Sequence, residues 1–233
     1  MIGPAAAPGG GDPAPPAGQK TYEANWESLA QWETPRWFED AVFGIYWHWG
    51  PYSVAGYGYS CWYGSSMYEP NAGPDYRGGD CYKHHVATWG DPFTRFGYKD
   101  FIPLLTAAKW DPDGWAELFK DIGADFAGPC AEHHDNFAMW DSKVTIWNSM
   151  AMGPRRDIVG DIAKALAARA MRFVVTFHNN GCNNWNYFNG GRKGCPEGVD
   201  VNNVDYFGLY GEPHDSPGAR HRMCLKFYQK AIE

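Results

Sequence analysis

The sequence has no long apolar run and no excess of basic residues. No stretch of about 18 consecutive apolar residues occurs in the 233-residue chain, so no membrane-spanning helix is expected. The 20 Lys and Arg residues are outnumbered by 27 Asp and Glu residues, and a net charge of -7 gives no basic surface for a phosphate backbone. Neither a membrane nor a nucleic acid is therefore expected as a partner.

The common metal-binding motifs are also missing. The six cysteines include no CxxC pair, which excludes a zinc ribbon or a thioredoxin-like motif. The histidines form neither an HxH pair nor an HExxH helix, and we predict no metal and no cofactor. Cys182 and Cys195, and also Cys61 and Cys81, lie in loops where an oxidising compartment would permit a disulfide.

The first 20 residues lack both a basic segment and a continuous apolar segment, so no signal peptide is visible. Their Pro, Ala and Gly content is typical of a disordered tail. The expected organisation is a tail over residues 1–20 and one domain over residues 21–233.

Aromatic residues, in contrast, are abundant at 17% of the chain, with 12 Trp and 14 Tyr. Rings that combine an apolar face with a polar group suit sugars, whose C–H faces stack while their hydroxyls form hydrogen bonds. A tryptophan-rich core explains the same composition equally well.

Short apolar runs alternate with amphipathic helices along the chain. In one helix, Trp115, Leu118, Phe119 and Ile122 recur at helical spacing behind the N-cap candidate Asp111. The long segment 54–98 has many Gly, Tyr and Pro residues and no sustained period, which predicts a functional loop. The expected strands are 43–48, 125–130 and 172–177, and the expected helices are 25–39, 111–123, 157–170 and 220–233.

This alternation predicts an α/β fold with parallel strands and crossover helices. A doubly wound sheet and a TIM-like (β/α)8 barrel both fit the periodicity. The barrel is favoured because no glycine-rich phosphate loop follows the first strand and polar clusters follow all three strands. Three strands cannot close a barrel, so we expect only its N-terminal portion, about three βα units, truncated before strand four.

Histidines follow each expected strand: His48 after the first, His133 and His134 after the second, and His178 after the third. The strand ends of a parallel barrel open on one face, so the four imidazoles should meet in one pocket. His133 and His134 would point in opposite directions in an extended chain, which disfavours joint binding of one metal ion. Hydrogen bonding to a polar ligand is the preferred interpretation.

Several segments resemble motifs of glycoside hydrolase family 29, the α-L-fucosidases. Residues 43–54, FGIYWHWGPYSV, resemble FGIFIHWGxYSV, and residues 131–148, AEHHDNFAMWDSKVTIWN, resemble KHHDGFxLWxSKxTxWN. Residues 153–160, GPRRDIVG, resemble the helix start GPxRDLVG, and residues 110–125 resemble the helix before the HHD strand. The resemblance covers about residues 26–177.

The resemblance implies a barrel enzyme that removes terminal α-L-fucose from glycans by a retaining mechanism without metal. It places histidines on the fucose hydroxyls and a tryptophan in the substrate pocket, with Phe177 at the position of a tyrosine. A family of this kind suggests a secreted, periplasmic or lysosomal protein. The expected substrate-binding residues are His48, Trp62, His133, His134, Phe177 and His178.

The sequence departs from the family pattern at Cys61, Glu132 and Asn136, which stand where an acidic residue, a lysine and a glycine are usual. A retaining glycosidase also needs two carboxyl groups about 5–5.5 Å apart. The family positions for both lie beyond the last residue, so no catalytic residue is assigned and this chain alone is expected to be inactive. Asp135 is the best-placed carboxylate, but a structural hydrogen bond within the turn is its expected role.

Two alternative functions remain open. One is a non-catalytic carbohydrate-binding half-barrel, and the other is a metal-dependent barrel hydrolase that uses His48, His133 and His178. A half-barrel would expose strand edges and apolar helix surface, so a homo-oligomer is possible.

Overall fold

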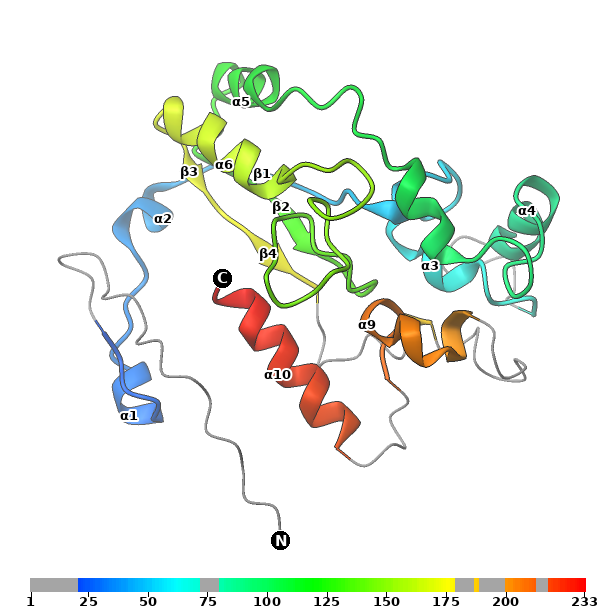
Figure 1. The fold of residues 1–233 in the computed structure, drawn as a ribbon. Coiled ribbons are helices and arrows are strands. Elements are labelled where there is room, and N and C mark those ends of the chain that lie inside the picture. The colour runs from blue at the N-terminus through cyan, green and yellow to red at the C-terminus, as the bar shows by residue number, and fades with distance from the viewer. Residues whose placement is uncertain (1–20, 72–79, 179–186, 189–199, 213–217) are drawn as a thin grey trace, which may run out of the picture. The chain divides into compact units, whose positions relative to one another are not determined.

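Residue contacts divide the chain into two units, residues 1–41 and residues 42–233, and each is described by itself. The expected tail at residues 1–20 lies outside the described residues. The computed structural model describes residues 21–71, 80–178, 187–188, 200–212 and 218–233 (Figure 1).

The first unit contains two short helices, α1 (Trp26–Leu29) and α2 (Arg36–Asp40), so the expectation of one helix over 25–39 was wrong. Asn25 caps α1 because its side chain accepts a hydrogen bond of 2.8 Å from the Ser28 amide. Pro35 separates the helices with φ -60° and ψ 134°, an extended conformation that a continuous helix does not allow.

The second unit is built on a parallel sheet, as predicted. Strand β2 (Phe126–Glu132) lies in the centre, and β1 (Gly44–Trp47) pairs with one edge in the register Gly44↔Phe126. On the other edge lie β3 (Arg172–Phe173) and β4 (Thr176–Phe177), two pieces of one predicted strand. The second unit is therefore of the α/β class. All its described strand pairings are parallel, and β3 and β4 follow one another along the same edge of β2.

Gly128 lets the third strand approach β2 closely. A Cβ atom on this residue would lie 1.4 Å from the carbonyl oxygen of Val174, between β3 and β4. The register also shifts between Cys130 and Glu132, where β4 pairs with β2. The close approach and the register shift explain why the structure has two short strands where the sequence predicts one.

Two helices connect the strands, and their predicted starting points are confirmed. The helix α5 (Pro112–Asp121) begins after Asp111, which accepts a hydrogen bond of 3.0 Å from the Gly114 amide. The helix α6 (Ile158–Ala168) begins after Asp157, which accepts one of 2.7 Å from the Gly160 amide. The two helices pack against each other, and α6 contacts β2 and β3.

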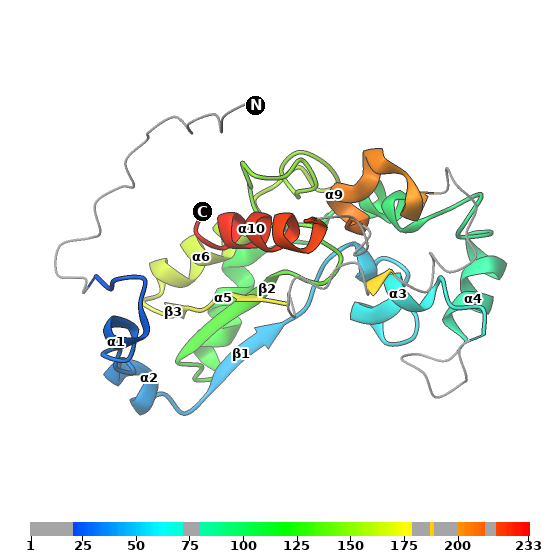
Figure 2. The same cartoon turned by 90° about the horizontal axis from the view of Figure 1, so that it is seen from below.

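The remaining elements lie mainly beyond the strand ends. The segment 54–98 contains helices, so its description as a loop was incomplete. In Figures 1 and 2, α3, α4 and α9 lie on the side toward which the strands point, while α10 and α6 lie on opposite sides of β4. The bounds are α3 Tyr63–Ser66, α4 Cys81–Thr88, α9 Phe207–Tyr210 and α10 Ala219–Ala231, with short 3-10 helices at Pro51–Ser53, Ser60–Trp62, Tyr98–Leu104, Asp200–Asn202 and Val204–Tyr206.

The core of this unit is rich in tyrosine. Tyr63, Tyr68, Tyr98 and Tyr210 are fully buried, and the hydroxyls of Tyr68 and Tyr210 lie 3.4 Å apart. Burial of phenols requires hydrogen-bond partners, which these hydroxyl groups have. Part of the aromatic surplus therefore belongs to the core.

Cys61 is not in a disulfide, so it is not bridged to Cys81, whereas Cys182 and Cys195 lie outside the described residues. None of the helices in the described part of the chain combines the length and the apolar character that crossing a membrane requires.

Candidate functional site

The predicted meeting of the histidines at the strand ends is confirmed. The His48 ring lies 5.2 Å from the His133 ring and 4.7 Å from the His178 ring, measured between centroids. The His133 ring lies 5.0 Å from His178 and 4.7 Å from His134. Parallel strands bring these positions together because their C-terminal ends share one edge of the sheet. We call these four residues the histidine cluster.

The sequence suggested that the His133 and His134 side chains point in opposite directions. In the structure they do not. They leave β2 in a turn, in which the Asn136 amide donates a hydrogen bond of 3.2 Å to the His133 carbonyl. Asn136 has a φ of 59°, a left-handed value that Asn tolerates better than most residues. The turn lets the donor atoms of His133, His134 and His178 come within 4.8 Å of one another.

Trp62 forms an aromatic wall of the cluster, at 5.8 Å from the His133 ring and 5.3 Å from the His134 ring. Tyr187 extends this wall, with its ring 5.5 Å from that of Trp62. Its hydroxyl donates a hydrogen bond of 2.7 Å to the Cys61 carbonyl. Tyr187 could not be predicted as part of the site because it follows a Gly- and Asn-rich segment without a recognisable motif.

Phe177 packs against aromatic residues outside the histidine cluster. Its ring lies 5.7 Å from Trp140 and 5.8 Å from Phe227 of α10. The next residue, His178, belongs to the cluster, as expected where neighbouring side chains of a strand alternate between faces. A role for Phe177 in substrate binding stays a prediction.

Tyr46 is a member of the site that the sequence analysis missed, because it appeared only as an apolar strand residue. Its hydroxyl lies 3.2 Å from Nε2 of His48 and 2.7 Å from Nε2 of His178. Burial raises the pKa of Tyr46 to about 12, so the phenol keeps its proton at neutral pH. It can donate that proton to one imidazole and accept a hydrogen bond from the other.

Burial favours the neutral form of three members of the histidine cluster, His48, His133 and His178. Burial, reinforced by the neighbouring imidazoles, lowers the pKa of His133 to about 2. Burial also lowers the pKa of His48 and of His178. Each neutral ring offers one donor and one acceptor nitrogen. Nδ1 of His133 is buried and has no hydrogen-bond partner among the described residues, so a ligand could satisfy it.

The nearby carboxyl groups are engaged in structural contacts. Asp135 is buried, and its Oδ1 accepts a hydrogen bond of 3.4 Å from the Phe137 amide within the turn, as expected. Its Oδ2 accepts a second one of 2.6 Å from the Tyr98 hydroxyl, which is distant in the sequence. Burial raises the pKa of Asp135 to about 7. Glu132 forms a buried ion pair with Lys230 of α10, with Nζ 2.5 Å from each carboxylate oxygen. Neither group is free to act as a nucleophile.

A cavity of about 650 Å³ lies beside the histidine cluster and shares His48 with it. Four tryptophans line it: Trp47, Trp49, Trp110 and Trp115. Four of the 12 tryptophans therefore lie around one cavity next to the histidine cluster. An aromatic hollow of this size is typical of ligand-binding surfaces.

Parallel strands with connecting helices, and with histidines beside aromatic rings at the strand ends, define an α/β protein. The family can be named more specifically. The model of the alpha-L-fucosidase family matches residues 13–220, and the chain belongs to this family.

Curated proteins similar to this chain include tissue alpha-L-fucosidases. The tissue alpha-L-fucosidase of Rattus norvegicus is 36% identical over 159 residues, which are 65% of this chain and 31% of that protein. The corresponding Homo sapiens protein is 34% identical over 162 residues, or 66% of this chain and 31% of that protein. The chain thus spans about a third of the length of these curated relatives.

Among solved structures, Thermotoga maritima alpha-fucosidase in complex with fucose is 40% identical, with a TM-score of 0.60. The match covers 67% of this chain and 37% of that one.

Proposed function

We propose that this chain forms the sugar-recognition part of an α-L-fucosidase that removes terminal α-L-fucose from glycans. The observation that carries the proposal is the convergence of His48, His133, His134 and His178 beside Trp62, at the ends of parallel strands. Family membership supports the same substrate class, since the matched relatives are fucosidases.

The chemistry of the cluster fits a sugar. Neutral imidazoles donate to and accept from hydroxyl groups at the same time, which cationic imidazoles cannot do. The unpartnered Nδ1 of His133 would gain a hydrogen bond from a bound hydroxyl. The Trp62 face would cover the apolar side of fucose, where its methyl group lies.

The proposed reaction follows the retaining mechanism, in which one carboxylate attacks the sugar and a second carboxyl group acts as acid and then base. Asp135 and Glu132 are occupied by Tyr98 and Lys230, so they are not candidates for these roles. We propose that the two carboxyl groups come from further βα units of a complete (β/α)8 barrel, of which β1, β2 and β3–β4 are the first three strands. The 233-residue chain would then bind fucose without hydrolysing its glycosides.

Two measurements test this proposal. Saturation-transfer NMR should detect L-fucose bound to the chain, and His48→Gln should weaken binding at least about tenfold if hydrogen bonds to the sugar are lost. His221→Gln, an exposed position on α10, is the control. Equal binding by the two variants would contradict the assignment of the cluster.

The second measurement is release of 4-nitrophenol from 4-nitrophenyl α-L-fucoside by the 233-residue chain and by a version extended with the downstream reading frame. Hydrolysis only in the extended version is expected. Hydrolysis by the short chain would mean that a carboxylate already present, with Asp135 the first to test, is the nucleophile. Binding without hydrolysis in both versions would favour a carbohydrate-binding module.

A further inference from the structure

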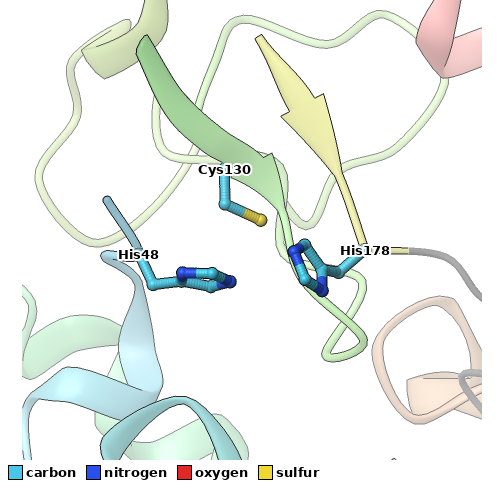
Figure 3. Close-up of side chains that lie close together, drawn as sticks. All are labelled: His48, Cys130 and His178. Carbon is cyan, nitrogen blue, oxygen red and sulfur yellow. The ribbon is translucent and has the colours of Figure 1, made fainter. Parts of the chain in front are cut away.

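We propose that His48, Cys130 and His178 form a binding site for Zn²⁺, and that the bound ion excludes the sugar. The claim that the ion excludes the sugar rests on the proposed function, because competition requires that the histidine cluster bind fucose. The metal site itself stands on the three side chains. Figure 3 shows the Cys130 sulfur pointing into the space between the two imidazole rings.

The geometry brings three metal-binding groups together from three strands. His48 follows β1, Cys130 lies within β2 and His178 follows β4. One donor atom from each lies within 4.8 Å of those of the other two. Donors around a tetrahedral Zn²⁺ ion lie about 3.5 Å apart, so small side-chain rotations would close the site.

The donor set selects the metal. Two imidazole nitrogens and one sulfur suit Zn²⁺, whereas Mg²⁺ and Ca²⁺ prefer oxygen ligands. The thiol binds as a thiolate, so the S–H proton passes to solvent as the sulfur–zinc bond forms. Three protein ligands leave a fourth position for water.

The Tyr46 hydroxyl occupies the position proposed for the ion. Its hydroxyl lies within hydrogen-bond distance of Nε2 of both His48 and His178. The two nitrogens therefore face one common point before any ligand arrives. An ion at that point would replace both hydrogen bonds, and the Tyr46 ring, in a residue that is 47% exposed, would have to move aside.

A second group of three, His133, His134 and His178, shares one residue with this site. It lacks sulfur, and His133 is more deeply buried than His48. We place the ion on the group with the thiolate because sulfur binds Zn²⁺ strongly and cancels part of its charge. The two possible positions of the ion can be distinguished by experiment, because only the group with His48 and His178 needs Cys130 for zinc binding.

No sequence motif could reveal this site. Its members stand at positions 48, 130 and 178, and local zinc motifs place ligands only a few residues apart. The sequence analysis expected no metal for this reason. If the site binds zinc, His48 and His178 are withdrawn from the sugar, and the ion acts as an inhibitor.

The test is equilibrium dialysis of the full 233-residue chain against Zn²⁺, with metal content measured by mass spectrometry. Titration with Co²⁺ as a spectroscopic probe reports sulfur coordination through a thiolate-to-cobalt charge-transfer band. We expect one ion per chain and the band. Cys130→Ser should abolish the band and weaken zinc binding at least about tenfold, because it removes a ligand and even the loss of a ligand's hydrogen-bond partner typically costs about 10–100-fold.

The matched control is Cys61→Ser, another free cysteine outside the group, which should bind like the wild type. An unchanged band in Cys130→Ser would overturn the proposal, as would binding that is lost in His134→Gln but kept in Cys130→Ser. His178→Gln, which also removes a ligand, replaces Cys130→Ser if that variant does not fold. L-Fucose binding without metal is measured in parallel: its absence would refute the proposed function while leaving the zinc result intact.

Discussion

At the scale of single residues, the site depends on side chains that stay neutral although they are titratable. His133 is 3% exposed, and burial lowers its pKa to about 2, whereas an unfolded histidine has a pKa of about 6.5. Between these values the unfolded chain binds a proton that the folded chain does not. Lowering the pH through this range therefore destabilises the fold, by about 2 kcal/mol at about pH 5 from His133 alone.

The prediction is that His133→Gln loses about 2 kcal/mol less stability than the wild type when the pH falls from about 7.5 to about 5. Urea unfolding followed by circular dichroism measures it. Asp135 contributes with the opposite sign, since its raised pKa stabilises the fold as the pH falls through about 7. That contribution is common to both proteins. Parallel pH curves for wild type and variant would show that His133 titrates normally.

Tyr98 and Asp135 form the second pair that matters at this scale. Both are buried, and the phenol donates a hydrogen bond of 2.6 Å to the carboxyl group. Tyr98→Phe leaves the carboxyl group with one partner fewer and should cost about 1–3 kcal/mol of unfolding free energy. Tyr228→Phe, at a position that is 63% exposed, is the control and should be neutral. Equal stability of the two variants would show that the hydrogen bond contributes nothing.

At the scale of elements, a buried ion pair fastens α10 to the central strand. Lys230 and Glu132 are 6% and 2% exposed, and they are separated by 98 positions in the sequence. Removing one partner of such a pair leaves a buried charge without compensation, which costs about 3–5 kcal/mol. Replacing both partners with apolar residues of similar size avoids that cost.

We therefore expect Lys230→Met to lose about 3–5 kcal/mol in urea unfolding, and the double variant Lys230→Met/Glu132→Leu to recover most of that loss. Lys226→Met, one turn earlier on α10 and exposed, is the control. A double variant as unstable as the single one would mean that the charge of Lys230 is not what matters.

The elements also show how far the sequence could lead. The N-caps Asp111 and Asp157 gave the starts of α5 and α6 because capping is a local interaction. The parallel direction of the strands was predicted from the alternation of strands and helices, and the meeting of the histidines followed from it. The pairing of Glu132 with Lys230 and the approach of Val174 to Gly128 could not be foreseen, because both depend on contacts between segments distant in the sequence.

At the scale of the whole molecule, the free edge of β1 stands out. Among the described strands, β2 is its sole neighbour, so the other edge leaves backbone groups without strand partners. Val42, two residues before the first residue of β1, is 94% exposed. Apolar side chains on α5 are exposed as well, with Leu118 at 57% and Ile122 at 52%. A strand edge next to exposed apolar surface favours association with a second chain.

The 233-residue chain should accordingly show a mass that rises with concentration when size-exclusion chromatography is coupled to light scattering. Val42→Lys places a charge at the strand edge, where lysine commonly prevents edge-to-edge pairing, and should shift the protein toward monomer. Val204→Lys adds the same charge at a site that is 72% exposed and outside the sheet, so it should leave the association unchanged. An equal shift in both variants would mean that net charge, not the β1 edge, controls association. A wild-type chain that stays monomeric at all concentrations would show that the edge is covered.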